Sequence, residues 1–371
     1  MTEYGGTAKL SSMAKIDAFF KLMFEQGASD LHLVSGQQPI LRLRGEMERV
    51  KYKVLENDEL KAMLYEIAPE MKIKQYEETG DVDFGYEIPG MARFRANFFQ
   101  QKNGCAAVFR LIPSKIVSAE DLGLHPILTQ AAMYRKGLVL VTGPTGSGKS
   151  TTLAAMMDFA NHHRHDHIIT VEDPIEFVHT SAKCLVNHRE IGRHTRSFGA
   201  ALKGALRQDP DIILVGEMRD LETIRLAVEA ASTGHLVFGT LHTVSAAKTV
   251  DRVIEVFPAE EQSQIRSTLA TSLKLVVAQN LFKRIDKKGR CAALEIMVCN
   301  AAIANLIRDN KTFQIPSAIQ TGKKAGMIAL DDAIMDLLNK KWISAEEAFD
   351  KCIDKSRFLG LLKEAPADYF G

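Results

Sequence analysis

The chain has 371 residues, of which 46% are apolar and 25% charged, and its formal net charge is +1. This is the profile of an ordinary globular protein that is long enough for two domains with separate cores. The near-neutral charge gives no support to a dedicated nucleic-acid-binding protein, and no apolar run reaches the roughly 20 residues that span a bilayer. The five cysteines form no CxxC pair, which disfavours a disulfide framework or a four-cysteine zinc site and suits a reducing compartment. We therefore expect a cytoplasmic protein without an integral membrane segment.

The first 112 residues are predicted to form a small α+β domain with an antiparallel sheet. Its sharpest signal is a hairpin over 82–98, where alternate apolar residues flank a turn at Pro89 and Gly90. Other segments alternate like strands or show the apolar spacing of helices. The expected elements are helices over 16–26 and 58–78, and strands over 29–34, 39–50, 82–88, 92–98 and 106–112.

A polar connector is expected over 113–123, and the pattern changes after it. Short, continuous apolar strands then alternate with helices, as in "GLVLVTG", "HIITVED", "DIILVGE" and "HLVFGTLHT". Runs this apolar are typical of a parallel sheet covered on both faces. From about residue 260 the chain is predicted to be mainly helical, with Ser344 and Glu347 as a capping box. The second domain is thus expected over 124–371.

The stretch "GPTGSGKS", residues 143–150, fits the pattern G-x4-G-K-[ST] between an apolar strand and a helix. Its glycines allow backbone N–H groups to surround phosphate oxygens, and the following helix presents its positive end. Lys149 is expected to neutralise β- and γ-phosphate charge, and the Ser150 hydroxyl to bind Mg²⁺. The predicted nucleotide-binding residues here are Gly143, Pro144, Thr145, Gly146, Ser147, Gly148, Lys149, Ser150 and Thr151.

Acidic residues follow two of the predicted strands. In "DPDIILVGEMRD" the place of the usual magnesium-binding aspartate is occupied by Gly216, and Glu217 follows it. We expect Glu217 to polarise water or to bind the hydrated metal, since ligands collect at the carboxyl ends of parallel strands. Glu172 and Asp173 are predicted metal ligands, and Glu176 shares with Glu217 the candidacy for catalytic base. The alternatives are a surface acid for Glu217, and capping or turn roles beside Pro174 for the other three.

Two histidines bracket the strand "LVFGTL". We predict that His242, which closes it, senses the γ-phosphate, and that His235, which opens it, contributes to nucleotide binding; the alternative for both is a satisfied polar group at a strand end. The cluster "HHRHDH" at 162–167 resembles a metal tag in composition. We interpret it as a helix end, where cations suit the helix dipole.

Taken together, these motifs resemble those of the type II/type IV secretion ATPases, and within them the retraction ATPases of type IV pili. The resemblance covers nearly the whole chain after Met13. It implies an N-terminal PAS-like domain followed by a RecA-like P-loop domain with a helical C-terminal part. It further implies a homohexamer that binds ATP and Mg²⁺ between domains, and an inner-membrane platform protein as partner, so that the protein would lie peripherally at that membrane. The matching stretches are "GPTGSGKSTT", "ITVEDPIEF", "DPDIILVGEMRD", "GHLVFGTLHT", "GASDLHL", "VFRLIPSKI" and "PSAIQTGKKAGM".

The same resemblance implies that Arg95 and Arg110 reach the γ-phosphate as arginine fingers, and it makes Arg207 a further candidate at the nucleotide. Without the resemblance, a solvated strand face would be the preferred interpretation of Arg95 and Arg110. One departure concerns "AIANLIRDN" at 302–310, where the retraction group usually has "AIRNLIRE". The central arginine is Ala304 here, which leaves open an accessory or paralogous pilus ATPase. A nucleic-acid translocase and a non-catalytic nucleotide-gated scaffold are the remaining alternatives.

Overall fold

The computed structural model describes residues 14–43, 45–112 and 116–362. The chain divides into two compact units, Met1–Lys115 and Ile116–Gly371, and each is described by itself. Of the expected connector, 113–115 lie outside the described residues, while 116–123 belong to the second unit. Among the helices of the described ranges, none combines the length and the apolar composition that a transmembrane helix needs.

The first unit contains a six-stranded antiparallel sheet in the order β3-β2-β1-β6-β5-β4. The predicted hairpin is confirmed, with a turn at Gly90, whose φ is +76°. Alternation puts Phe94, Phe98 and Phe109 on one face, where they form the core with Phe20 of the first helix. The elements are α1 (Asp17–Glu25), β1 (Asp30–Val34), β2 (Ile40–Leu43), β3 (Glu46–Arg49), α2 (Asn57–Ile67), α3 (Glu70–Thr79), β4 (Asp81–Ile88), β5 (Ala92–Gln101) and β6 (Gly104–Ile112).

The single helix expected over 58–78 is two helices, because Pro69 interrupts it. Ala68 has φ −85° and ψ 134°, the extended conformation that a residue before proline prefers. Pro69 then caps α3. The proline signal was present in the sequence, and the helical apolar spacing on both sides of it masked the break.

The second unit is built on a seven-stranded sheet in the order β13-β12-β7-β11-β10-β8-β9. All neighbouring strands are parallel except the β12–β13 pair. The four apolar segments expected to form a parallel sheet are all strands of it, which confirms that prediction. The strands are β7 (Gly137–Thr142), β8 (His167–Glu172), β9 (Leu185–Glu190), β10 (Ile212–Val215), β11 (Leu236–Leu241), β12 (Leu273–Lys283) and β13 (Arg290–Val298).

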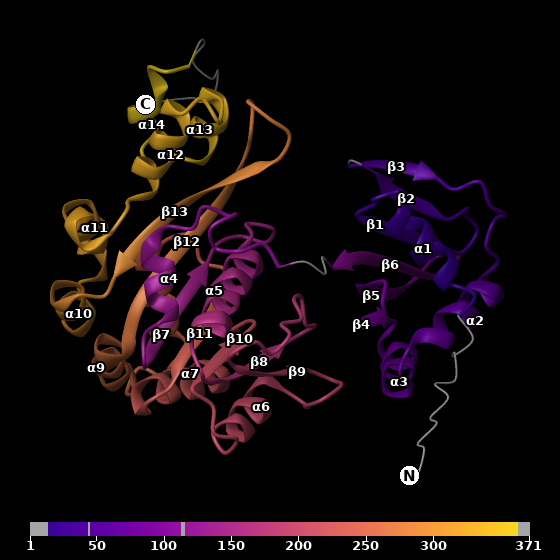
Figure 1. Ribbon diagram of the computed structural model, residues 1–371, viewed down its shortest axis with the longest axis horizontal. Coiled ribbons are helices and arrows are strands. Elements are labelled where there is room, and N and C mark those ends of the chain that lie inside the picture. The colour runs from indigo at the N-terminus through magenta and orange to yellow at the C-terminus, as the bar shows by residue number, and fades with distance from the viewer. Residues whose placement is uncertain (1–13, 44, 113–115, 363–371) are drawn as a thin grey trace, which may run out of the picture. The chain divides into compact units, whose positions relative to one another are not determined.

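Helices cover both faces of this sheet (Figure 1). Val139, Val141 and Phe238 pack under α4 and α5 on one face. On the other face Leu140 and Val237 belong to a second apolar cluster, shared mainly with α7, α8 and α9. The helices are α4 (Pro126–Ala132), α5 (Lys149–His163), α6 (Phe198–Ala205), α7 (Leu221–Thr233), α8 (Ala246–Glu255) and α9 (Gln262–Ser272).

The region after residue 260 differs from its mainly helical prediction, because β12 and β13 form a long hairpin there. β12 lies beside β7, and Phe282 and Ala293 of the hairpin form a core with Leu330 and Ile334 of the C-terminal helices. These are α10 (Ala301–Arg308), α11 (Ile315–Thr321), α12 (Leu330–Asn339), α13 (Ala345–Lys351) and α14 (Lys355–Leu359), with short 3₁₀ turns at Thr312–Gln314 and Lys323–Ala325.

The predicted capping box at α13 is half formed. The Ser344 hydroxyl accepts a hydrogen bond from the Glu347 N–H at 3.2 Å, as expected of an N-cap. The Glu347 carboxylate instead accepts from the backbone N–H of Lys283 on β12 at 3.2 Å. The side chain therefore joins the helix to the sheet.

Candidate active site

The loop at 143–148 joins β7 to α5 at the carboxyl edge of the parallel sheet. Gly143, Gly146 and Gly148 have φ values of +138°, +78° and +88°, which side-chain-bearing residues rarely adopt. The helix begins directly after the loop, where the Thr152 N–H donates to the carbonyl of Gly148 at 3.0 Å. The backbone geometry thus has the form that the phosphate-binding prediction requires.

Lys149 is folded back on this loop. Its ammonium donates to the carbonyls of Gly143 at 2.9 Å and Pro144 at 3.1 Å. Burial lowers the pKa of Lys149, and the nearby charges of Glu217 and Glu176 oppose that shift. The predicted lysine and two of the predicted acids therefore lie within electrostatic range of one another.

Glu217 follows β10 and is held from two sides. Arg219 forms a bidentate ion pair with the carboxylate, in which Nη2 donates to Oε2 at 2.5 Å and Nε contacts Oε1. The Nε2 of His242 contacts Oε1 at 2.8 Å. Burial raises the pKa of Glu217, but Arg219 and His242 outweigh it, and the net shift is downward. The carboxylate is therefore ionised at neutral pH, and His242 must donate the proton of their hydrogen bond.

The segment after β8 is organised by buried carboxylates. Glu172, 8% exposed, accepts a hydrogen bond from the Glu176 N–H at 3.3 Å. Glu190 on the neighbouring strand, 3% exposed, accepts from the Ile175 N–H at 3.1 Å. Asp173 is exposed, and it adds to the effect of the hydrogen bond from Arg219 to Glu217, which is the main reason why the pKa of Arg219 is raised. Glu172 thus has the turn-stabilising contact that was considered as an alternative to metal binding. Asp173 and Glu176 are the exposed acids of this segment.

Glu172 also lines a pocket together with Ser150, Gly216 and Thr240. Thr240 fixes one wall, since its hydroxyl donates to the carbonyl of Gly216. Across the described ranges, no three acidic, histidine or cysteine side chains converge to hold a metal by themselves. Mg²⁺ is commonly held through one or two carboxylates and the phosphates of a nucleotide, so a hydroxyl and one or two acids suit it.

His235 and Arg207 do not join this group within their own chain. His235 precedes β11, where its Nδ1 contacts the carbonyl of Ala230 at 3.1 Å. Arg207 is exposed and comes shortly before β10. Both lie where parallel strands begin, whereas the phosphate loop lies where they end. The strand direction thus puts both residues at the opposite edge of the sheet from the phosphate loop of their own chain, and their role at a nucleotide stays a prediction.

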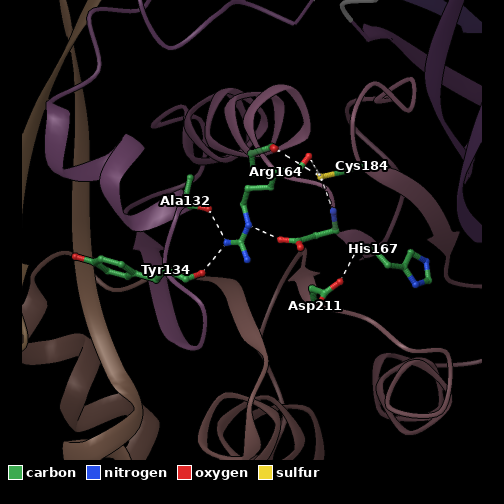
Figure 2. A network of polar contacts seen from close by, with 8 residues as sticks. Ala132, Tyr134, Arg164, His167, Cys184 and Asp211 are labelled. Atoms are coloured by element: carbon green, nitrogen blue, oxygen red, sulfur yellow. Dashed lines mark hydrogen bonds and ion pairs between the residues drawn. The ribbon is translucent and has the colours of Figure 1, made fainter.

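The histidine-rich cluster is a helix end, as interpreted from the sequence. His162 and His163 complete the last turn of α5. Beyond it, Arg164 donates to the carbonyls of Ala132 at 3.0 Å and Tyr134 at 2.6 Å, and pairs with Asp166 (Figure 2). This network holds the end of α5 against the segment after α4.

In the first unit the two predicted arginine fingers are direct neighbours. Arg95 on β5 and Arg110 on β6 are paired across the strands, so they lie on the same face of the sheet. Arg95 contacts Asp83 at 3.4 Å, and Arg110 contacts Asp30 at 2.8 Å. Like charges directly opposite each other repel, and these aspartates offset that repulsion. Their role at a nucleotide stays a prediction.

Gln279 and Glu190 belong to the site and were missed from the sequence. Gln279, on β12, contacts the phosphate loop, and Glu190 orients the segment that carries Asp173 and Glu176. Both depend on strands whose neighbours the sequence does not reveal. The placement of β12 beside β7 is the signal that would have indicated Gln279.

The RecA-like sheet, the phosphate loop and the acids at its carboxyl edge define a P-loop ATPase. The chain belongs to the Type II/IV secretion system protein family, which matches residues 8–328. It is 56% identical over 327 residues to the type IV pilus retraction ATPase PilT of Pseudomonas aeruginosa, covering 88% of this chain and 95% of that protein.

Two further comparisons extend this result. The type IV pilus ATPase PilU of P. aeruginosa is 35% identical over 358 residues, covering 96% of this chain and 94% of that protein. A crystal structure of the pilus retraction motor PilT with bound ADP superimposes with a TM-score of 0.85 at 41% identity, covering 93% of this chain and 99% of that one.

Proposed function

We propose that this chain is the motor ATPase that powers retraction of type IV pili. The observation that carries the proposal is the 56% identity to a pilus retraction ATPase over nearly the full length of both chains. Identity to the type IV pilus ATPase PilU of the same organism is 35%, which favours a retraction motor of the PilT kind over one of the PilU kind. The motor would act as a homohexamer at an inner-membrane platform protein, on the cytoplasmic side.

The site residues suit ATP hydrolysis by attack of water on the γ-phosphate. The loop N–H groups and Lys149 would bind the phosphates, and Ser150 with Asp173 or Glu217 would hold Mg²⁺, which supplies charge neutralisation. Glu217 is ionised and fixed in orientation by Arg219 and His242. It is therefore suited to orient or deprotonate the attacking water, with Glu176 as the other candidate.

The paired arginines support a site completed by another subunit. Arg95 and Arg110 present two cations on one sheet face, with aspartates as their present partners. A γ-phosphate would replace those partners, and an arginine that stabilises transition-state charge is worth roughly 10³–10⁵ in rate in GTPases. Hydrolysis would then require assembly of the ring.

The test is phosphate release measured against protein concentration for the wild type and for the double variant Arg95→Ala/Arg110→Ala. We expect the specific activity of the wild type to rise cooperatively with assembly. The double variant should lose most of its activity while still binding ATP. Turnover that is independent of concentration and of both arginines would refute the shared site. Lys149→Ala and Glu217→Gln at wild-type turnover would refute the assignment of the catalytic residues.

The accessory pilus ATPase is the second candidate, because Ala304 stands where the retraction group carries arginine. Ala304 lies on α10 and packs against the core beside Ile303 and Ile307. Expression of this chain in a bacterium that lacks its own retraction ATPase would separate the candidates. Restored twitching supports the retraction motor, and twitching restored only by Ala304→Arg supports the accessory role.

A further inference from the structure

Gln279 connects β12 to two positions of the segment that carries the phosphate loop, Ser147 and Thr152, which lie on either side of Lys149 and Ser150. Its side-chain amide donates from Nε2 to the carbonyl of Ser147 at 2.7 Å. Its Oε1 accepts from the hydroxyl of Thr152 at 2.7 Å. The residue is 3% exposed, so these two bonds are made out of contact with water. Lys149 and Ser150 lie on the segment between the two bonded positions.

Two of the three loop glycines, Gly143 and Gly148, pack against the same residue. A Cβ at Gly143 would lie 2.3 Å from the main-chain oxygen of Gln279. A Cβ at Gly148 would lie 2.8 Å from its Nε2. At Gly146, between them, nothing lies within 4 Å. The two ends of the loop therefore rest on Gln279, while the middle of the loop is open to a ligand.

We infer that Gln279 is a positioning residue for the nucleotide, which holds the phosphate loop in its binding shape before the nucleotide arrives. This inference rests on the proposed nucleotide site and adds how that site is kept ready. β12 is the immediate neighbour of β7, whose end leads into the loop. The loop is thereby fastened at its start by its own strand and at its far end by a neighbouring strand.

A preformed loop affects affinity more than turnover. If only a fraction of the molecules has the competent loop, the apparent dissociation constant rises in inverse proportion to that fraction. Once nucleotide is bound, the loop is ordered in every molecule, and the catalytic step proceeds as before. A residue that only stabilised the fold would leave both constants unchanged in the folded protein.

The test is Gln279→Met, which keeps the length of the side chain and removes both hydrogen bonds. We expect its dissociation constant for ADP to rise about tenfold, equivalent to about 1.4 kcal/mol. The kcat at saturating ATP should stay within about threefold of wild type. The backbone N–H groups of residues 145–149 should exchange hydrogen faster than in wild type without nucleotide, and at the wild-type rate with saturating ADP. Gln264→Met, at an exposed position of α9, is the matched control.

Thr152→Val removes one of the two bonds at nearly constant volume, and it keeps the test valid if Gln279→Met does not fold. It should weaken ADP binding less than Gln279→Met does, and the double variant should be no weaker than Gln279→Met, because the two side chains share one interaction. Wild-type ADP affinity in both single variants would overturn the inference. So would a loss of kcat without a change in affinity. If Lys149→Ala also keeps wild-type ADP affinity, the nucleotide site itself is wrongly assigned, and the proposed function fails with it.

Discussion

The glycines of the phosphate loop allow a prediction in which geometry alone sets the order of effects. Gly143→Ala and Gly146→Ala make the same chemical change at φ +138° and +78°, where alanine is strained. At Gly146 an added Cβ meets nothing within 4 Å. At Gly143 it would lie 2.3 Å from the main-chain oxygen of Gln279 and 2.7 Å from the Ser147 hydroxyl.

The expected costs follow from these contacts. A left-handed backbone costs alanine about 1–2 kcal/mol, and the loss of glycine's freedom in the unfolded chain returns about 0.4–1 kcal/mol. Gly146→Ala should therefore lower the free energy of unfolding by about 1 kcal/mol. Gly143→Ala adds overpacking against a backbone atom, which typically costs about 1–3 kcal/mol more. Its total is about 2–4 kcal/mol.

The assay is urea denaturation without nucleotide, with Gly90→Ala in the first unit as a control at φ +76° and no close neighbour. We expect Gly90→Ala and Gly146→Ala to agree within about 0.5 kcal/mol, since they share only the backbone strain. Gly143→Ala should lower the free energy of unfolding more than either of them. If all three variants lose the same stability, the contact between the loop and β12 does not constrain Gly143, and the reasoning fails.

Two further predictions concern ionisation. Burial raises the pKa of Glu295 above the ordinary range of a glutamate, although the Ala246 N–H donates to it at 2.6 Å. The folded state thus holds the proton more tightly than the unfolded state. The free energy of unfolding of Glu295→Gln should therefore increase relative to that of wild type as pH rises above about 4.5, by up to about 1.4 kcal/mol per pH unit. Denaturation curves of both proteins at several pH values measure this difference. A difference that does not change with pH would contradict the prediction. Arg219→Gln should raise the pKa of Glu217 and shift the acid limb of the pH–rate profile of phosphate release to higher pH. The shift is moderated by solvent, because the Arg219 side chain is 75% exposed. An acid limb that does not move would exclude Glu217 as the titrating base.

The sequence predicted the parts of the site whose geometry is local. The phosphate loop is contiguous, and the order strand, loop, helix is sufficient to place Lys149 and Ser150. Glu217 and His242 were also predicted, because each follows a strongly apolar strand and parallel strands end at one edge of a sheet. Their contact at 2.8 Å shows that the two strand ends are close.

Other features depend on which strands become neighbours, and periodicity does not encode that. "LVVAQNLF" and "ALEIMV" are short apolar runs of the kind that cannot be assigned to helix or strand by pattern alone. Because these two strands were not predicted, neither the contact of Gln279 with the phosphate loop nor the contact of Glu295 with the start of α8 could be predicted. His235 lies at the start of its strand, on the other edge of the sheet from the phosphate loop of its own chain, so its role at a nucleotide stays a prediction.

The hairpin of β12 and β13 also determines where this chain can change in length. Side chains alternate between the two faces of a strand, so one inserted or deleted residue within it reverses every later position. Gln279 would leave the loop, and Glu295 would leave the end of α8. The connection at 286–289 is exposed and lies outside both strands, so a change in its length does not alter which face a strand residue occupies. Homologous sequences are therefore expected to align without gaps through both strands and to vary in length at this tip, which is also the place to attach a probe without disturbing the nucleotide.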